Sequence, residues 1–315
     1  RENIEELKRN GLHSYQVSLE GLEEHNDNIR GKGSFKKTIN ALKLISDSGL
    51  WPVVSLTLTK DNIEDIPKMV PLLESLGVKG FGVRRLIPEG RGSQLKDSLL
   101  EPDELKAFYL KIAQIEKGLR EKGSKLFIRI GCESGIFNED SINQKQYCGI
   151  HAESGVFTVM PNGDVYNCRR LPIKIGNITE SSFQSIMNDS KKSWEIKNLN
   201  NVHPFCSKCS NFMQCFGGAK CVTYAYTGKL SIPDIQCWKY FKKIESIEYY
   251  DNFKEIIAQD LELSPGIKRW HDHNVNSEQQ PQDIKLTKDR NNFKTTDRVK
   301  LKTSNKCNNN CIYCD

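Results

Sequence analysis

Residues 51–87 read WPVVSLTLTKDNIEDIPKMVPLLESLGVKGFGVRRLI. Val53–Leu58 is rich in β-branched residues, which is typical of a buried strand. Apolar side chains then recur at helical spacing between residues 66 and 76, and Gly77 ends that run. Gly80–Ile87 is a second apolar strand. A strand, a helix and another strand in this order predict two parallel strands joined by a crossover helix.

The same alternation extends in both directions. We expect helices at 2–10, 35–48 and 101–122, strands at 15–19 and 125–130, and a loop at 20–34. Repeated β–α units predict an α/β fold built on a parallel sheet or barrel. In such barrels the carboxyl ends of the strands carry the chemistry.

Length and composition exclude several classes of protein. The 315 residues permit a barrel domain with an appendage, and a chain of this size buries a core without disulfides. No apolar run approaches the roughly 20 residues that a membrane span requires. The net charge of +6 gives little support to a nucleic-acid partner. The sequence starts at Arg1 rather than Met, so we expect a fragment or a processed chain.

Eleven cysteines are the most informative count. An odd, clustered set in a long chain favours bound metal or clusters in a reducing compartment over disulfides. A cytoplasmic, anoxic location is therefore expected. Short strands replace the long helices from Cys132 onward, and residues 155–168 predict a hairpin with Asn162-Gly163 in a primed turn.

Near the end of the chain, Cys307, Cys311 and Cys314 have the spacing C-x3-C-x2-C after a strand-like segment. Thiolates are soft ligands that suit iron–sulfur clusters or zinc. Three ligands in one loop can hold three irons of a [4Fe-4S] cubane and leave the fourth iron open to a small molecule. A zinc knuckle with its fourth ligand elsewhere is the alternative.

With Tyr313 before its last cysteine, this loop resembles the signature of the radical S-adenosylmethionine (SAM) superfamily. The resemblance implies a partial (β/α)6 barrel, of which this chain holds the back half. It also implies that SAM binds the open iron and is split, after one-electron reduction, into methionine and a 5′-deoxyadenosyl radical. A flavodoxin or ferredoxin would donate the electron.

The other cysteines resemble the SPASM extension of that superfamily, which carries two auxiliary [4Fe-4S] clusters. Five residues separate Cys215 from Cys221, where the family usually has three. The resemblance implies one cluster held by Cys206, Cys209, Cys215 and Cys237, and another held by Cys132, Cys148, Cys168 and Cys221. Two four-cysteine zinc sites are the alternative.

Residues 15–35 resemble the fourth strand of the radical SAM barrel and its loop, with Glu20 where the family commonly has Asp. The resemblance implies SAM contacts from Ser18, Arg30, Asn62 and Arg84. A guanidinium can bind a carboxylate through two parallel hydrogen bonds, which suits Arg30 to the carboxylate of SAM.

The order of the segments is unusual for this superfamily, because the three-cysteine loop normally follows the first strand. We therefore expect four segments: barrel half 1–130, SPASM domain 131–240, helix and polar linker 241–297, and the first strand and cluster loop of a radical SAM core at 298–315. That last segment belongs either to a second, tandem module or to a reordered chain. The isolated stretch is expected to be inactive.

The resemblance implies an enzyme that modifies a peptide or protein side chain, of the ribosomal-peptide maturase type. Arg169-Arg170 stand where sulfatase-maturing relatives often carry Asp, which suits an acidic peptide or an anionic tetrapyrrole. Two alternatives stay open: a radical SAM enzyme acting on a small molecule such as a tetrapyrrole precursor, and a non-catalytic module that binds zinc or clusters.

Overall fold

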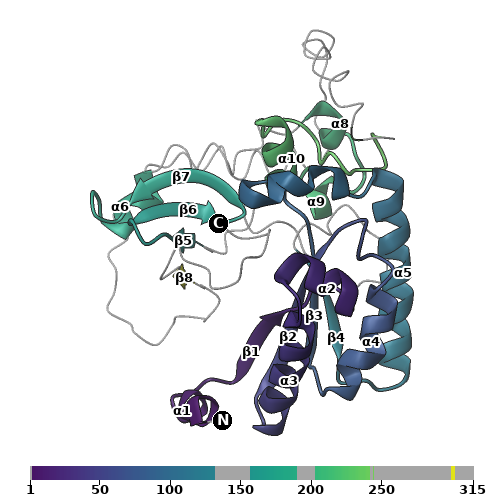
Figure 1. Cartoon of the computed structure of the whole chain (residues 1–315). Helices are drawn as coiled ribbons and strands as arrows, with labels where there is room; N and C mark the ends of the chain where they lie inside the picture. The colour runs from purple at the N-terminus through teal and green to yellow at the C-terminus, as the bar shows by residue number, and fades with distance from the viewer. Residues whose placement is uncertain (1, 132–156, 190–202, 242–243, 245–298, 302–315) are drawn as a thin grey trace.

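The computed structural model describes residues 2–131, 157–189, 203–241, 244 and 299–301. Figure 1 shows them as two assemblies, each built on its own sheet. We call residues 2–131 the barrel part, and the described residues between 157 and 244 the cysteine-rich part. The predicted linker and three-cysteine loop lie outside the described residues.

The sheet of the barrel part is wholly parallel. Its strands are β1 (Ser14–Ser18), β2 (Trp51–Leu58), β3 (Gly80–Arg85) and β4 (Phe127–Ile130), paired in that order. Helices connect successive strands, as repeated β–α units require. These are α3 (Ser34–Asp47), α4 (Ile66–Ser75) and α5 (Pro102–Glu121), and α1 (Glu2–Arg9) precedes them. The expected α/β class and parallel sheet are confirmed.

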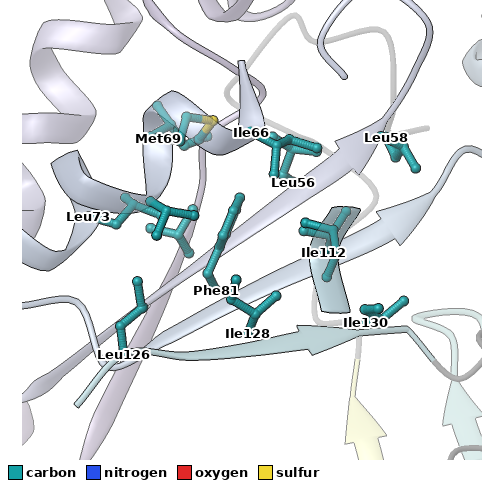
Figure 2. Packing of buried hydrophobic residues seen from close by; sticks show 14 of the residues in the cluster. Leu56, Leu58, Ile66, Met69, Leu73, Phe81, Ile112, Leu126, Ile128 and Ile130 are labelled. Atoms are coloured by element: carbon teal, nitrogen blue, oxygen red, sulfur yellow. The ribbon is translucent and has the colours of Figure 1, made fainter. Parts of the chain in front are cut away.

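The core of the barrel part lies between the sheet and its helices. Figure 2 shows Phe81 and Ile128 from the strands packed with Met69 and Leu73 of α4 and with Ile112 of α5. Alternate residues of β2 are buried, which is the period-two pattern of a strand with one face on a core. The opposite face of each strand is left half exposed or exposed.

One helix replaces an expected loop. Residues 20–34 contain α2 (Glu23–Arg30), whose sequence EEHNDNIR has no apolar stripe. Its buried residue is Asn26, which donates a hydrogen bond to Ser34 Oγ at 2.8 Å. The expectation of a loop was wrong because polar contacts, and not hydrophobic periodicity, hold this helix in place.

The cysteine-rich part is built on a small sheet. The strands β5 (Phe157–Val159), β6 (Asp164–Cys168) and β7 (Leu171–Asn177) are antiparallel, and β8 (Val299–Leu301) pairs with β5 in parallel. The short helices α6 (Phe183–Asp189), α8 (Pro204–Ser207), α9 (Phe212–Cys215) and α10 (Lys220–Thr227) follow β7. Thus β8, expected as the first strand of a barrel, pairs with the cysteine-rich sheet.

The expected hairpin is present, but the predicted type of turn is wrong. The amide of Gly163 donates to Met160 O at 2.9 Å, so a longer loop joins β5 and β6. Gly163 has φ +85°, whereas Asn162 is not among the residues with positive φ. A primed turn with both central residues left-handed is therefore excluded.

The 3₁₀ helix η1 (Gly90–Ser98) follows the end of β3 and reaches the cysteine-rich part. Its Lys96 lies over the ring of Tyr226 in α10, with Nζ 3.8 Å from the ring centroid. Among the described helices, none is both long and apolar enough to cross a membrane.

Candidate functional site

A row of polar side chains crosses the less buried face of the parallel sheet near its carboxyl edge. Ser18 of β1 is in register with Ser55 of β2, and Thr57 is in register with Arg84 of β3. Residues in register on parallel strands point to the same side of a sheet. The structure therefore brings Ser18 and Arg84, both predicted from sequence, to one face.

Sequence reasoning missed three members of this face: Ser55, Thr57 and Arg129. Arg129 of β4 is in register with Gly82, whose missing side chain leaves space between the strands. The signal was available, because V-S-L-T-L and I-R-I alternate apolar and polar residues. Hydroxyl and guanidinium groups in such a row can bind the hydroxyls and carboxylate of a polar ligand.

Arg30 is paired with Glu20 at the end of β1. Its Nη2 and Nε donate to Glu20 Oε1 at 2.6 and 3.1 Å, and the amide of Thr57 donates to Glu20 Oε2 at 2.7 Å. Burial raises the pKa of the Glu20 carboxyl, and the charge of Arg30 opposes that rise. The predicted contact of Arg30 with SAM stays a prediction, and Glu20 holds the guanidinium beside the polar face.

Asn62 closes the end of β2. Its amide is fully buried, donates to Glu20 O and Thr57 O at 2.9 and 2.8 Å, and accepts from the amide of Thr59 at 2.9 Å. These bonds fix the two loops that follow β1 and β2. Asn62 thus has a positioning role in the structure, and its predicted contact with SAM stays a prediction.

Four of the predicted ligands line one hollow in the cysteine-rich part. Cys206 lies in α8, Cys209 follows it, Cys215 ends α9, and Cys237 comes from the segment after α10. The hollow is partly open, with about 330 Å³ of space when the adjoining solvent is included, and Phe212, Asp234, Lys239 and Tyr240 are among its other walls. The cysteines that are spaced closely in sequence thus converge at one site. All six described cysteines are free thiols.

Burial raises the pKa of three of these thiols, Cys206, Cys215 and Cys237. It raises the pKa of Cys206 to about 12 and that of Cys237 to about 11, and it raises the pKa of Cys215 well above its usual value. Backbone amides already donate to two of the sulfurs: Gly217 to Cys215, and Lys239 and Tyr240 to Cys237. Metal must displace the protons before the thiolates bind, and amide donors then stabilise their charge.

The donor set of this hollow fits an iron–sulfur cluster. Among the residues that the structure describes, no three His, Cys, Asp or Glu side chains converge around one metal position. A tetrahedral zinc site needs its sulfurs about 2.3 Å from one point, whereas a cubane binds each thiolate at a different iron and spaces them wider. The four thiols around this hollow supply one thiolate for each iron of a cubane.

The chain turns sharply after Cys215. Phe216, Gly217 and Gly218 all have positive φ, at 50°, 82° and 79°. A Cβ on Gly218 would overlap the side chain of Asp234, so glycine is required there both for conformation and for space. This turn leads directly into α10 and forms one wall of the hollow.

A buried ion pair joins the hollow to the end of β3. Arg85 Nη2 and Nη1 lie 2.6 and 3.0 Å from the two oxygens of Asp234, and both side chains are almost fully buried. Asp234 also accepts the amide of Ala219 at 2.8 Å, and Arg170 donates to Arg85 O at 2.7 Å. Two parallel bonds between residues 149 positions apart fix the two parts against each other.

Two ligands predicted for the second auxiliary cluster are described. Cys221 is buried in the core of the cysteine-rich part, and Cys168 packs against the same core. Their predicted partners Cys132 and Cys148 lie outside the described residues, as do Cys307, Cys311 and Cys314. The ligation of those two clusters therefore stays a prediction.

Comparison with known proteins agrees with this geometry. Residues 148–210 match the model of the SPASM family, described as an iron–sulfur cluster-binding domain. The fold matches a structure of anSMEcpe with bound AdoMet and the Cp18Cys peptide, with a TM-score of 0.60 and 19% identity over 81% of this chain and 72% of that chain. The chain has a radical SAM fold and carries a SPASM domain.

Two curated relatives extend the comparison of this radical SAM chain. Mycofactocin maturase MftC of Mycolicibacterium smegmatis is 30% identical over 232 residues, which are 70% of this chain and 56% of that protein. AdoMet-dependent heme synthase of Methanosarcina barkeri is 27% identical over 245 residues, or 72% of this chain and 68% of that protein. The chain thus spans a little over half the length of the maturase.

Proposed function

We propose that this chain acts in a radical SAM enzyme that modifies a peptide or protein side chain. The likeness to mycofactocin maturase, together with the hollow lined by four cysteines, carries the proposal. The cofactors are SAM and up to three [4Fe-4S] clusters. When bound, the SAM-associated cluster supplies the electron that splits SAM and yields a radical able to take hydrogen from the substrate.

We assign the barrel domain predicted at residues 1–130 to SAM, with Ser18 and Arg84 as direct contacts on the polar face. Glu20 keeps Arg30 in place next to that face, and Asn62 holds the two loops that follow β1 and β2. Such fixed donors orient a ligand before the reaction and reduce the entropy lost on reaching the reactive geometry.

We assign the SPASM domain (131–240) to two auxiliary clusters with the ligands given above, and the segment 298–315 to the SAM-binding cluster through Cys307, Cys311 and Cys314. Residues 241–297 form the linker in this division. We further propose that a flavodoxin or ferredoxin donates the electron, and that the protein works in the cytoplasm, where free thiols and clusters survive.

A tetrapyrrole precursor is the second candidate substrate, because the heme synthase is covered by this chain over 68% of its length. Arg170 is held against the end of β3, whereas Arg169 is exposed. An exposed arginine suits the carboxylates of an acidic peptide and the propionates of a porphyrin equally well. Incubation with each substrate class and mass spectrometry of the product separates the two.

The test of the function is SAM cleavage by the full-length protein, reconstituted with iron and sulfide without air, because the isolated 315-residue stretch is expected to be inactive. We expect iron and sulfide near twelve of each per chain, brown absorption near 400 nm, and 5′-deoxyadenosine when SAM and dithionite are added. Colourless protein that holds zinc and releases no 5′-deoxyadenosine would support the binding-module alternative and overturn the proposal.

Two variants separate the cluster assignments. Replacing Cys307, Cys311 and Cys314 by Ala should abolish 5′-deoxyadenosine formation and remove about four irons. Cys206→Ala should also lower the iron content by up to about four, but should leave SAM cleavage measurable. If the C-terminal variant keeps full SAM cleavage, the three-cysteine loop serves another site.

A further inference from the structure

Lys220 is a buried lysine in an unfavourable position. It is the first residue of α10 and only 3% exposed, and its Nζ donates to Leu230 O at 2.8 Å and Ile232 O at 3.2 Å. Burying an ammonium group costs free energy. A positive charge at a helix N-terminus also opposes the helix dipole. Helix stability therefore does not explain a lysine at this place.

The ammonium group lies against the wall of the four-cysteine hollow. A Cβ on Gly217 would lie 3.1 Å from Lys220 Nζ and 3.9 Å from Cys206 Sγ, and Gly217 itself lines the hollow. The nitrogen and the sulfur therefore both lie beside this glycine, at most about 7 Å from each other.

The other charges around the hollow are arranged differently. Asp234 lines it but is bound by Arg85 through two short contacts, so this pair adds little net charge. Lys239 lines the hollow as well, yet its side chain is exposed to solvent, which screens it. Lys220 is buried in the protein interior, where the dielectric constant is low and a charge interacts more strongly with its neighbours.

We infer that Lys220 tunes the reduction potential of the auxiliary cluster held by Cys206, Cys209, Cys215 and Cys237, by stabilising its reduced form. This inference rests on the cluster ligation proposed above. Reduction adds one electron, so a cubane with four thiolates passes from a dianion to a trianion. A buried cation stabilises the trianion more and raises the potential. A higher potential makes the oxidised cluster a better acceptor for an electron that leaves the substrate radical.

The test is a potentiometric titration followed by electron paramagnetic resonance, on the reconstituted protein without air. The cluster concerned is the one whose signal disappears in Cys206→Ala. In Lys220→Met we expect the ratio of reduced to oxidised cluster at a fixed potential to fall about tenfold, which is about 59 mV for a one-electron couple. The signal of the SAM-binding cluster should stay within twofold of the wild type.

Three further variants control for structure. Lys239→Met removes an exposed lysine at the same hollow and should change the reduced fraction less than threefold. Lys220→Arg keeps the charge and should stay near the wild type. Lys220→Gln keeps a donor for the two carbonyls but not the charge, so it should behave like Lys220→Met and serves if that variant folds poorly.

The outcomes are distinct. If Lys220→Gln or Lys220→Met retains its iron and the wild-type potential, the inference is overturned. If the wild-type protein binds no iron at all, the proposed function fails instead, and the role of Lys220 falls with it.

Discussion

The two parts of this molecule bury very different material. The barrel part closes over aliphatic and aromatic side chains such as Leu56, Phe81 and Ile112. The cysteine-rich part has a hydrophobic core too, but it also buries thiols, an ammonium and a carboxylate around a hollow. Hydrocarbon burial stabilises a fold without help, whereas buried polar groups stabilise it only once they are paired or bound to metal. We therefore expect the second part to depend on its clusters.

Polar contacts, like those inside the cysteine-rich part, also join the two parts. Besides Arg85 and Asp234, Gln236 Nε2 donates to Leu100 O at 2.7 Å, and the amide of Ile244 donates to Glu101 Oε2 at 2.9 Å. Glu101 is also the N-cap of α5, in a capping box with Glu104. Hydrogen bonds of this kind fix how the two parts are oriented. Substitutions at the boundary are therefore expected to have the largest effects.

The largest expected effect comes from Asp234→Ala. It leaves the guanidinium of Arg85 buried without its carboxylate, which costs about 3–5 kcal/mol. Urea denaturation followed by circular dichroism measures the loss. The double variant Arg85→Met/Asp234→Ala should lose clearly less than the sum of the two single variants. Additive losses would mean that the pair is not coupled.

A smaller effect, confined to the barrel part, is expected from Asn62→Ala. The change leaves two carbonyls and one amide at the ends of β1 and β2 without their partner, at a cost of about 1–3 kcal/mol. Hydrogen exchange should speed up at residues 57–65 but not in the cysteine-rich part. Asn162→Ala, in the exposed hairpin turn, is the matched control and should cost about 0.5 kcal/mol or less. Equal losses in the two variants would contradict the assigned role.

The smallest effect concerns pH. Asp27 accepts hydrogen bonds from the amides of Phe35 and Gly33 and from Ser34 Oγ, and these bonds lower its pKa to about 2. Because the folded pKa lies below the unfolded value of 3.8, the stabilisation is complete above about pH 4 and is lost as the pH falls through 2.

Unfolding free energies of the wild type and of Asp27→Asn, measured from about pH 5 down to pH 2, check this effect. The difference between the two proteins should shrink as the pH falls. A difference that does not change with pH would assign the stabilisation to the shape of the side chain and not to its charge.

Much of the barrel part could be predicted from sequence because its signals are local. The alternation in β2 and the helical stripe of α4 follow directly from which side chains must leave water. The helix α2 could not be predicted in this way, since Asn26 and Asp27 hold it through hydrogen bonds to residues that come later in the chain.

The candidate site was predictable only in part. The spacing of Cys206, Cys209 and Cys215 identified three walls of the hollow, and Cys237 followed from the family resemblance. Nothing local marks Arg85 or Lys220 as special, because their partners come from distant segments or from carbonyl groups. Contacts of that kind depend on the assembled fold, and sequence patterns of short range do not record them.

Gly218 affects both parts of the molecule through its contact with Asp234. Any side chain at this position would displace Asp234, and Asp234 in turn holds the end of β3 through Arg85. A substitution in the turn after Cys215 would thus be felt at a strand end of the other part. A tolerated substitution of this glycine would therefore need a compensating change at Asp234 or at Arg85, more than a hundred residues earlier.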